Sequence, residues 1–127
     1  MGTQTVKGEE PGAGPDPIEL VNEVRLVGRI SGAPEERTLP SGDSVWTLRV
    51  VVPRTGERHG SRASVDALEC AVWTGRVRRS VATWRVGDVV EVSGQLRRRF
   101  FRAGGAAASR VEVEVTAGRI IRRAASG

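Results

Sequence analysis

The sequence predicts an all-β fold: a five-stranded barrel with one short helix between the third and fourth strands. Two observations support this prediction. In five stretches, apolar and polar residues alternate with the period of two that is typical of half-buried strands. One further stretch, residues 75–84, instead spaces Val77, Val81 and Trp84 at i, i+4 and i+7, as on one side of an amphipathic helix. Because strands and helices do not alternate along the chain, a doubly wound α/β fold is excluded.

The first three predicted strands lie before the helix. Residues 22–30 place apolar side chains opposite arginines, and we expect the following Ser-Gly-Ala-Pro to end this strand. The state of residues 35–39 is left open, and Pro-Ser-Gly-Asp at 40–43 indicates a turn. Residues 44–52 and 64–73 are the second and third strands.

Two strands follow the helix. Residues 89–102 form the fourth predicted strand, which places Val90, Val92 and Leu96 on one side and ends in Arg-Arg-Arg-Phe-Phe-Arg. We expect residues 103–109 to form a flexible loop and residues 110–116 to form the fifth strand. The order of three strands, one helix and two strands predicts an OB-fold barrel with the helix plugging one end.

The composition predicts one domain and excludes several classes of protein. Residues 1–19 are rich in Gly and Pro and are expected to be a disordered arm, residues 20–121 the domain, and residues 122–127 a short basic end. No apolar run reaches membrane-spanning length and the N-terminus does not resemble a signal peptide, so we expect a cytoplasmic protein. One Cys and one His predict no metal site and no cofactor.

Basic residues are concentrated in the second part of the chain. Residues 1–75 carry 8 basic and 11 acidic side chains, whereas residues 76–127 carry 12 and 4. A strongly basic segment indicates a nucleic acid or another acidic partner. Since 19 of the 20 basic residues are Arg, a GC-rich genome is an alternative source of this bias.

Several motifs together resemble those of bacterial single-stranded DNA-binding proteins. They are Asn-Glu-Val-Arg-Leu-Val-Gly at 22–28, Ala-Pro-Glu-Glu-Arg at 33–37, Pro-Ser-Gly at 40–42, Cys-Ala-Val-Trp at 70–73 and Gly-Gln-Leu-Arg-Arg-Arg-Phe-Phe at 94–101. The resemblance covers about residues 22–116. It implies an OB-fold that binds single-stranded DNA without catalysis, in replication, repair or recombination, and that is associated with the nucleoid. It also implies a homo-oligomer, either a tetramer or a dimer.

The resemblance also implies which residues contact the DNA. Phe101 stands where the family usually carries a stacking aromatic residue, whereas Leu68 and Thr74 stand where rings are common in the family. The other expected contacts are arginines on the outward sides of strands, in the loop after the second strand, or beside the hairpin: Arg49, Arg54, Arg58, Arg62, Arg76, Arg97, Arg99, Arg102 and Arg110. We expect the stacking to depend mainly on Phe101.

Other residues have a simpler interpretation. Trp46, Trp73 and Trp84 lie on apolar sides of their elements, which favours core packing over base stacking for all three. Phe100 shares the parity of Leu96 and is expected to pack in the core or at its rim. His59 and Cys70 are interpreted as a surface histidine and a small strand residue, and no catalytic residues are predicted.

The ending of the sequence differs from that of the family's housekeeping members. Those proteins end in a flexible tail with an acidic, Phe-containing tip that recruits other enzymes, and this sequence has no acidic residue after Glu114. We therefore expect a short or accessory version of the family without recruitment by an acidic tail. Two alternatives stay open at this point: an RNA-binding OB module, and a protein-interaction barrel that binds no nucleic acid.

Overall fold

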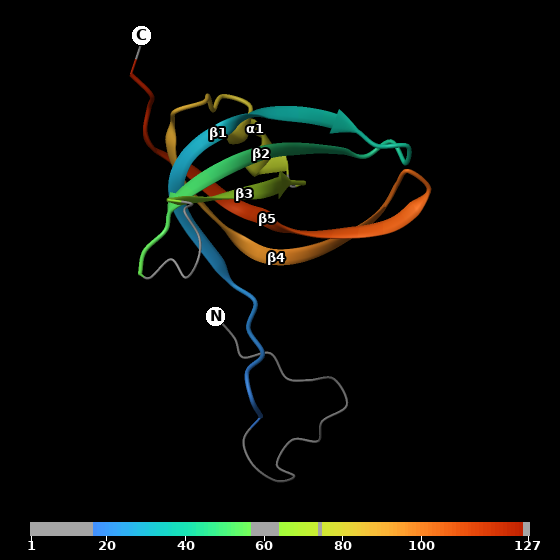
Figure 1. The fold of residues 1–127 in the computed structure, drawn as a ribbon. Helices are drawn as coiled ribbons and strands as arrows, with labels where there is room; N and C mark the ends of the chain where they lie inside the picture. Colours follow the sequence, from blue (N-terminus) through green and yellow to red (C-terminus); the bar gives the residue numbers. More distant parts are fainter. Residues whose placement is uncertain (1–16, 57–63, 74, 126–127) are drawn as a thin grey trace.

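The five predicted strands and the single helix are all present and form a closed barrel (Figure 1). The structure is a computed structural model and describes residues 17–56, 64–73 and 75–125. The elements are β1 (Val24–Thr38), β2 (Ser44–Pro53), β3 (Val65–Val72), α1 (Gly75–Val81), β4 (Val89–Ala103) and β5 (Ala106–Arg122).

The strands follow the order β1-β2-β3-β5-β4 around the barrel, and β1 pairs with β4 to close it. All neighbours are antiparallel except β3 and β5, which are parallel. This arrangement, with the helix between β3 and β4 in the chain, confirms the predicted OB-fold barrel.

The core is built mainly from valines whose side chains point into the barrel, because alternate residues of each strand share a side. Val77, Val81 and Trp84 of the helical segment are also buried, which confirms the predicted apolar side of the helix. The core cluster consists of Ile30, Leu48, Val50, Cys70, Val72, Val77, Val81, Trp84, Val90, Val92, Val113 and Val115. Burial in this core raises the pKa of the Cys70 thiol to about 12, so this thiol stays protonated at neutral pH.

β1 and β5 extend several residues beyond the limits predicted for them. β1 does not end at Gly32 and Pro34 but continues to Thr38, with register shifts between Ile30 and Gly32 and between Gly32 and Glu35. A β-bulge takes up an irregular residue without ending the pairing, so these breaking residues bend the strand instead of stopping it.

The predicted flexible loop at 103–109 is also replaced by regular structure. β4 and β5 are joined only by Gly104 and Gly105, whose φ angles of 59° and 84° are those of a two-residue type I′ hairpin turn. Two consecutive positive φ angles are easily adopted only by glycine, so this turn lets the small residues 106–109 continue as strand.

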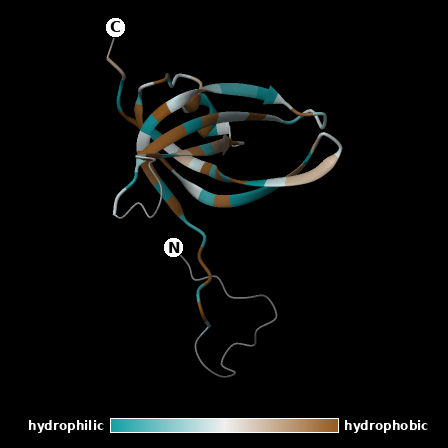
Figure 2. Cartoon of the chain, viewed as in Figure 1, coloured by the Kyte–Doolittle hydropathy of each residue, from teal (hydrophilic) through white to brown (hydrophobic). Residues whose placement is uncertain are grey.

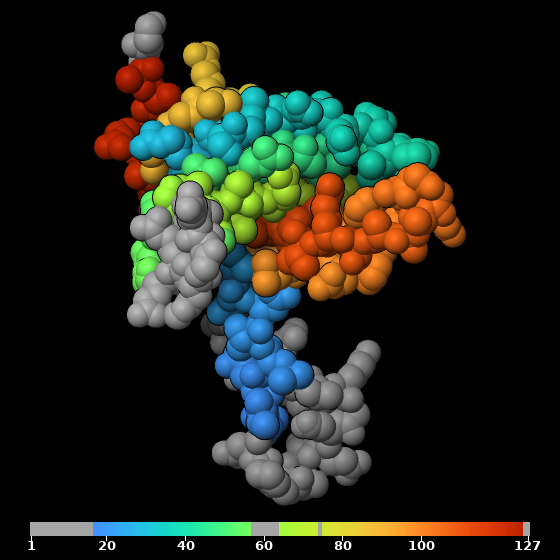
Figure 3. Space-filling view, in the orientation of Figure 1, coloured from blue at the N-terminus to red at the C-terminus, as the bar shows by residue number. Residues whose placement is uncertain are grey.

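Both long hairpins extend beyond the packed part of the barrel toward the same side of the molecule (Figures 1 and 3). Hydrophobic residues are concentrated where the five strands come together, while the two extended hairpins are mostly hydrophilic or weakly hydrophobic (Figure 2). The molecule therefore has a packed barrel and two arms, one from β1 and β2 and one from β4 and β5.

Within the part of the chain that the structure describes, no helix is long and apolar enough to cross a membrane.

Candidate nucleic-acid interface

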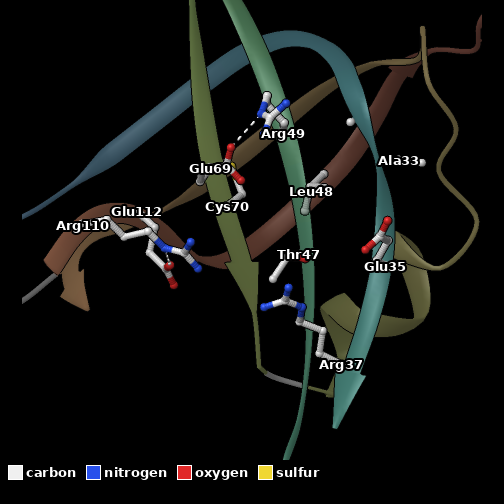
Figure 4. A pocket seen from close by; sticks show the side chains of 11 residues that line it. Ala33, Glu35, Arg37, Thr47, Leu48, Arg49, Glu69, Cys70, Arg110 and Glu112 are labelled. Carbon is white, nitrogen blue, oxygen red and sulfur yellow. Dashed lines mark hydrogen bonds and ion pairs between the residues drawn. The ribbon is translucent and has the colours of Figure 1, made fainter. Parts of the chain in front are cut away.

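The outward-facing side of the barrel carries a groove of about 450 Å³ across β1, β2, β3 and β5. Arg49 and Glu69 form an ion pair on one wall, with 2.6 Å between Nε and Oε2, and Arg110 lies 3.4 Å from Glu112 on another (Figure 4). The groove is lined by Gly32, Ala33, Glu35, Arg37, Thr47, Leu48, Arg49, Glu69, Cys70, Arg110 and Glu112.

Next to this groove, β3, β5 and the β4 arm bring aromatic rings and arginines together. We call this surface the basic-aromatic face and define it by Trp73, Arg97, Arg99, Phe101 and Arg110. The guanidinium of Arg99 lies 4.7 Å from the centroid of the Trp73 ring, and that of Arg110 lies 5.6 Å from the Phe101 ring. Both distances are within the range of a cation–π contact, so each ring carries a neighbouring cation.

The register of the strands explains why these residues meet. Arg97 is opposite Glu112, Arg99 is opposite Arg110, and Phe101 is opposite Ala108. Directly opposite residues of an antiparallel pair share a side of the sheet. The alternation along β4 therefore puts every second residue of its basic run on the outward side.

Carboxylates hold the arginines of this face in position. Arg97 lies 2.6 Å from Glu114, and Arg99 lies 3.0 Å from Glu112, whose side chain is only 5% exposed. The hydrogen bond from Arg97 holds the pKa of Glu114 below its ordinary value, so this glutamate is ionised at neutral pH. The arginines are thus oriented before any ligand binds, but part of their charge is already neutralised.

Four predicted contacts lie on the outward side of the barrel: Arg49 in the groove, and Arg97, Arg99 and Phe101 on the β4 arm. Arg110 joins them from β5. Arg54 follows β2 directly and pairs with Asp66 at 3.0 Å. Arg58, Arg62, His59 and Thr74 lie outside the described residues.

Three other predicted contacts lie elsewhere. Arg102 is on the opposite side of the hairpin from Phe101, and its Nη1 donates a hydrogen bond to the carbonyl oxygen of Gly105 at 2.9 Å. Arg76 is exposed on α1 and not on the sheet. Leu68 is opposite Val50 and therefore shares the inward-facing side of β3 with Cys70 and Val72.

Two aromatic residues differ from their predicted positions. Trp46 packs against the core and Trp84 is buried, as predicted, but Trp73 lies outside the core cluster and contacts Arg99. Phe100 does not pack either: it is 78% exposed, because the β4 arm extends past the barrel and has no core beneath it. The sequence did contain a signal for the position of Trp73. Glu69 lies four residues earlier and therefore on the same side of the extended chain, and its charge marks that side as outward.

The chain is similar to known proteins in sequence and in fold. The model of the single-strand binding protein family matches residues 21–121. The chain belongs to this family. Among curated relatives, single-stranded DNA-binding protein A of Bacillus subtilis is 30% identical over 80 residues, which are 63% of this chain and 46% of the relative. Single-stranded DNA-binding protein 1 of Staphylococcus aureus is 34% identical over 80 residues, 63% of this chain and 48% of the relative.

The chain spans about half the length of the curated relatives it matches. A solved structure of the Plasmodium falciparum single-stranded DNA-binding protein in complex with single-stranded DNA has the same fold. Its TM-score is 0.64 at 21% identity, and the match covers 83% of this chain and 96% of the other. The family predicted from the sequence motifs is therefore confirmed.

Proposed function

We propose that this protein binds single-stranded DNA, largely without regard to base sequence, through the basic-aromatic face and the adjoining groove. The observation that carries the proposal is the placement of Trp73 and Phe101 on one outward surface, each with an arginine beside its ring. Unpaired bases stack on exposed rings while arginines neutralise the phosphates between them. Membership of the single-strand binding protein family supports the same function.

Stacking explains why a single strand is the expected ligand. In a duplex the bases are already stacked on one another, so an exposed ring has no free base surface to contact. Each base–aromatic stack contributes about 1–3 kcal/mol to binding and tolerates any base. We also propose, from the family, that the protein acts as a homo-oligomer in the cytoplasm and serves replication, repair or recombination.

The arginines make a smaller contribution than their number suggests. Arg97, Arg99 and Arg110 already contact Glu112 or Glu114, so a phosphate must replace or share these carboxylates. An exchange of one anion for another gains less free energy than the pairing of a free cation. The proposed affinity therefore depends on stacking more than it would on a surface of unpaired arginines.

The two neighbouring phenylalanines allow a matched test of the site. Phe101→Ala removes a ring from the basic-aromatic face and is expected to weaken binding of an oligo-dT strand about 5- to 150-fold, equivalent to one stacked base. Phe100→Ala removes a ring of the same size from the opposite side of the hairpin and is expected to leave the affinity unchanged. Fluorescence titrations of both variants with the oligo-dT strand measure the two changes in affinity. Equal losses, or a larger loss for Phe100→Ala, would contradict the proposed site.

A further inference from the structure

One edge of β4 has no neighbour over half of its length. β1 pairs with β4 only from Val89 to Gly94, whereas β4 continues to Ala103 alongside β5. Among the described residues, no strand pairs with the other edge of β4 beyond Gly94. An open edge of this kind presents unpaired backbone N–H and C=O groups to any extended segment that can reach it.

Asn22 shows which backbone groups of β4 point outward from this edge. Its side-chain amide donates to the carbonyl oxygen of Leu96 at 2.9 Å and accepts from the Leu96 N–H at 2.8 Å. Backbone groups alternate in direction along a strand, so those of Arg98 and Phe100 point toward the same open edge. The Asn22 side chain thus occupies the position where a paired strand would place its backbone.

The same part of the β4 arm carries apolar side chains without a core to cover them. Leu96 and Val111 are each 47% exposed and Phe100 is 78% exposed. All three lie on the inward-facing side of the hairpin, because Leu96 is opposite the buried Val113 and the alternation continues to the tip. This side of the arm lacks a partner among the described residues.

A complementary segment lies immediately before β1. We call residues 17–21 (Pro-Ile-Glu-Leu-Val) the strap. Ile18 and Leu20 are 77% and 62% exposed. Figure 1 shows the strap running out below the barrel, away from the end of the β4–β5 hairpin.

We propose that the strap of the same chain extends β1 along the open edge of β4. In the existing register Val24 is opposite Gly94, so a continuous extension places Asn22 opposite Leu96, Leu20 opposite Arg98 and Ile18 opposite Phe100. Ile18 and Leu20 then lie on the same side as Leu96 and Phe100 and cover the exposed apolar surface. The interface is a direct continuation of the β1–β4 pairing.

Two further residues of the strap fit this register. Pro17, which lacks an N–H group, falls at a position whose backbone points away from β4, where an edge strand tolerates proline. Glu19 falls opposite Arg99 on the outward side, where its carboxylate meets a strongly basic strand. Closure replaces the two Asn22 side-chain hydrogen bonds with backbone bonds from residues 22, 20 and 18.

The strap is favoured over a second copy as the occupant because Asn22 already holds the chain at the first position of the edge. The strap is joined directly to Asn22, and a tethered segment has a high effective concentration at its own edge. Other extended peptides would have to displace it.

Amide hydrogen exchange on the full chain, without DNA, tests the proposal. Leu20→Pro removes an N–H that would bond to β4, whereas Glu19→Pro removes one that would point away. In the wild type and in Glu19→Pro, we expect the amides of Arg98 and Phe100 to be protected by the strap. Their exchange is expected to be slower than in Leu20→Pro by roughly a factor of ten or more. Equal exchange of these amides in all three proteins would overturn the proposal.

A disulfide test distinguishes the chain's own strap from that of another copy. In Ile18→Cys/Phe100→Cys, the two cysteines share a side and are expected to form an intrachain disulfide under mild oxidation. In the matched control, Glu19→Cys/Phe100→Cys, they lie on opposite sides and are expected to stay reduced. Mass measurement under non-reducing conditions reads the result. Interchain disulfides, or equal cross-linking of the two pairs, would show that the strap does not occupy its own edge.

Discussion

Glu114 determines how much positive charge the basic-aromatic face offers to a ligand. Its carboxylate accepts hydrogen bonds from Arg97 at 2.6 Å and from Gln95 at 3.0 Å, and it lies 3.9 Å from Arg99. It therefore orients the arginines and at the same time competes with a phosphate for them. These two effects have opposite signs for binding, and a substitution separates them.

We predict that Glu114→Gln raises the affinity for an oligo-dT strand. The amide keeps the size and one acceptor of the carboxylate, while its lost charge frees Arg97 for a phosphate. For one added phosphate contact, the slope of log K against log salt is expected to become steeper by about 0.7. Titrations at several salt concentrations measure both effects, and a lower affinity would mean that Glu114 acts mainly by positioning the arginines.

On β3, the sequence correctly predicted that side chains alternate between two sides. It was wrong about which of these sides faces the core. Residues 67–73 alternate as expected, but apolar side chains occur on both sides, so the pattern does not say which side faces the core. Leu68 was expected on the outward side and Trp73 in the core, and the structure has the reverse. Phe100 and Phe101 could not be distinguished by burial from the sequence, since the reach of the β4 arm past the barrel depends on all five strands.

At the scale of elements, the pairing of β4 with β5 is irregular where β4 passes from the barrel into the arm. The register shifts between Ser93 and Gly94, and Thr116 of β5 is the extra residue, as in a β-bulge. A Cβ atom on Gly94 would lie 1.8 Å from the carbonyl oxygen of Glu114. Only glycine fits here without moving the backbone of β5.

We predict that Gly94→Ala destabilises the protein by about 1–3 kcal/mol, because the added methyl group overpacks the strand pair. Urea denaturation followed by tryptophan fluorescence measures the change in the free energy of unfolding. Gly42→Ala provides a partial control: its positive φ of 95° carries a conformational cost, but nothing lies within 4 Å of its Cβ position. A smaller loss for Gly94→Ala than for Gly42→Ala would contradict the overpacking argument.

The type and order of the elements were predictable from the sequence, and several of their ends were not. Period-two alternation reports a strand wherever one side is buried, which holds for all five. The alternation does not show that β1 continues past Gly32 and Pro34, where bulges keep the strand paired. It also does not show the strand at residues 106–109, because their small side chains have no apolar–polar pattern. Pairing with a neighbouring strand decides both cases, and a single sequence does not contain that information.

At the scale of the whole molecule, Asp88 ties the chain's C-terminal part to the turn before β4. It is 1% exposed, and its carboxylate accepts hydrogen bonds from the backbone N–H groups of Arg85 at 2.9 Å and Ala124 at 2.7 Å, with Arg123 at 3.2 Å. Burial alone would raise the pKa of this carboxyl. The hydrogen bonds from Ala124 and Arg85 and the charge of Arg123 outweigh burial and lower it.

We predict an acid-dependent loss of stability that originates at Asp88. Because its pKa is lowered by folding, its ionised form stabilises the protein above the ordinary value of 3.8, and this contribution is lost as pH falls through the lowered value. Asp88→Asn is expected to be less stable by about 1–3 kcal/mol at neutral pH, since the amide cannot accept all these bonds. Unfolding measured across the acid range should show the two proteins converging at low pH. A constant difference at every pH would contradict the assignment.

The proposed binding of single-stranded DNA is mainly independent of base sequence, because it uses stacking and phosphate contacts on the outward surface. Its most direct test is a fluorescence titration of the full chain with oligo-dT and with a duplex of equal length over a series of salt concentrations. We predict tighter binding of the single strand and a fall in log K with log salt of about 0.7 for each phosphate neutralised. An affinity that does not change with salt concentration, or a higher affinity for the duplex, would show that the protein does not bind in this way.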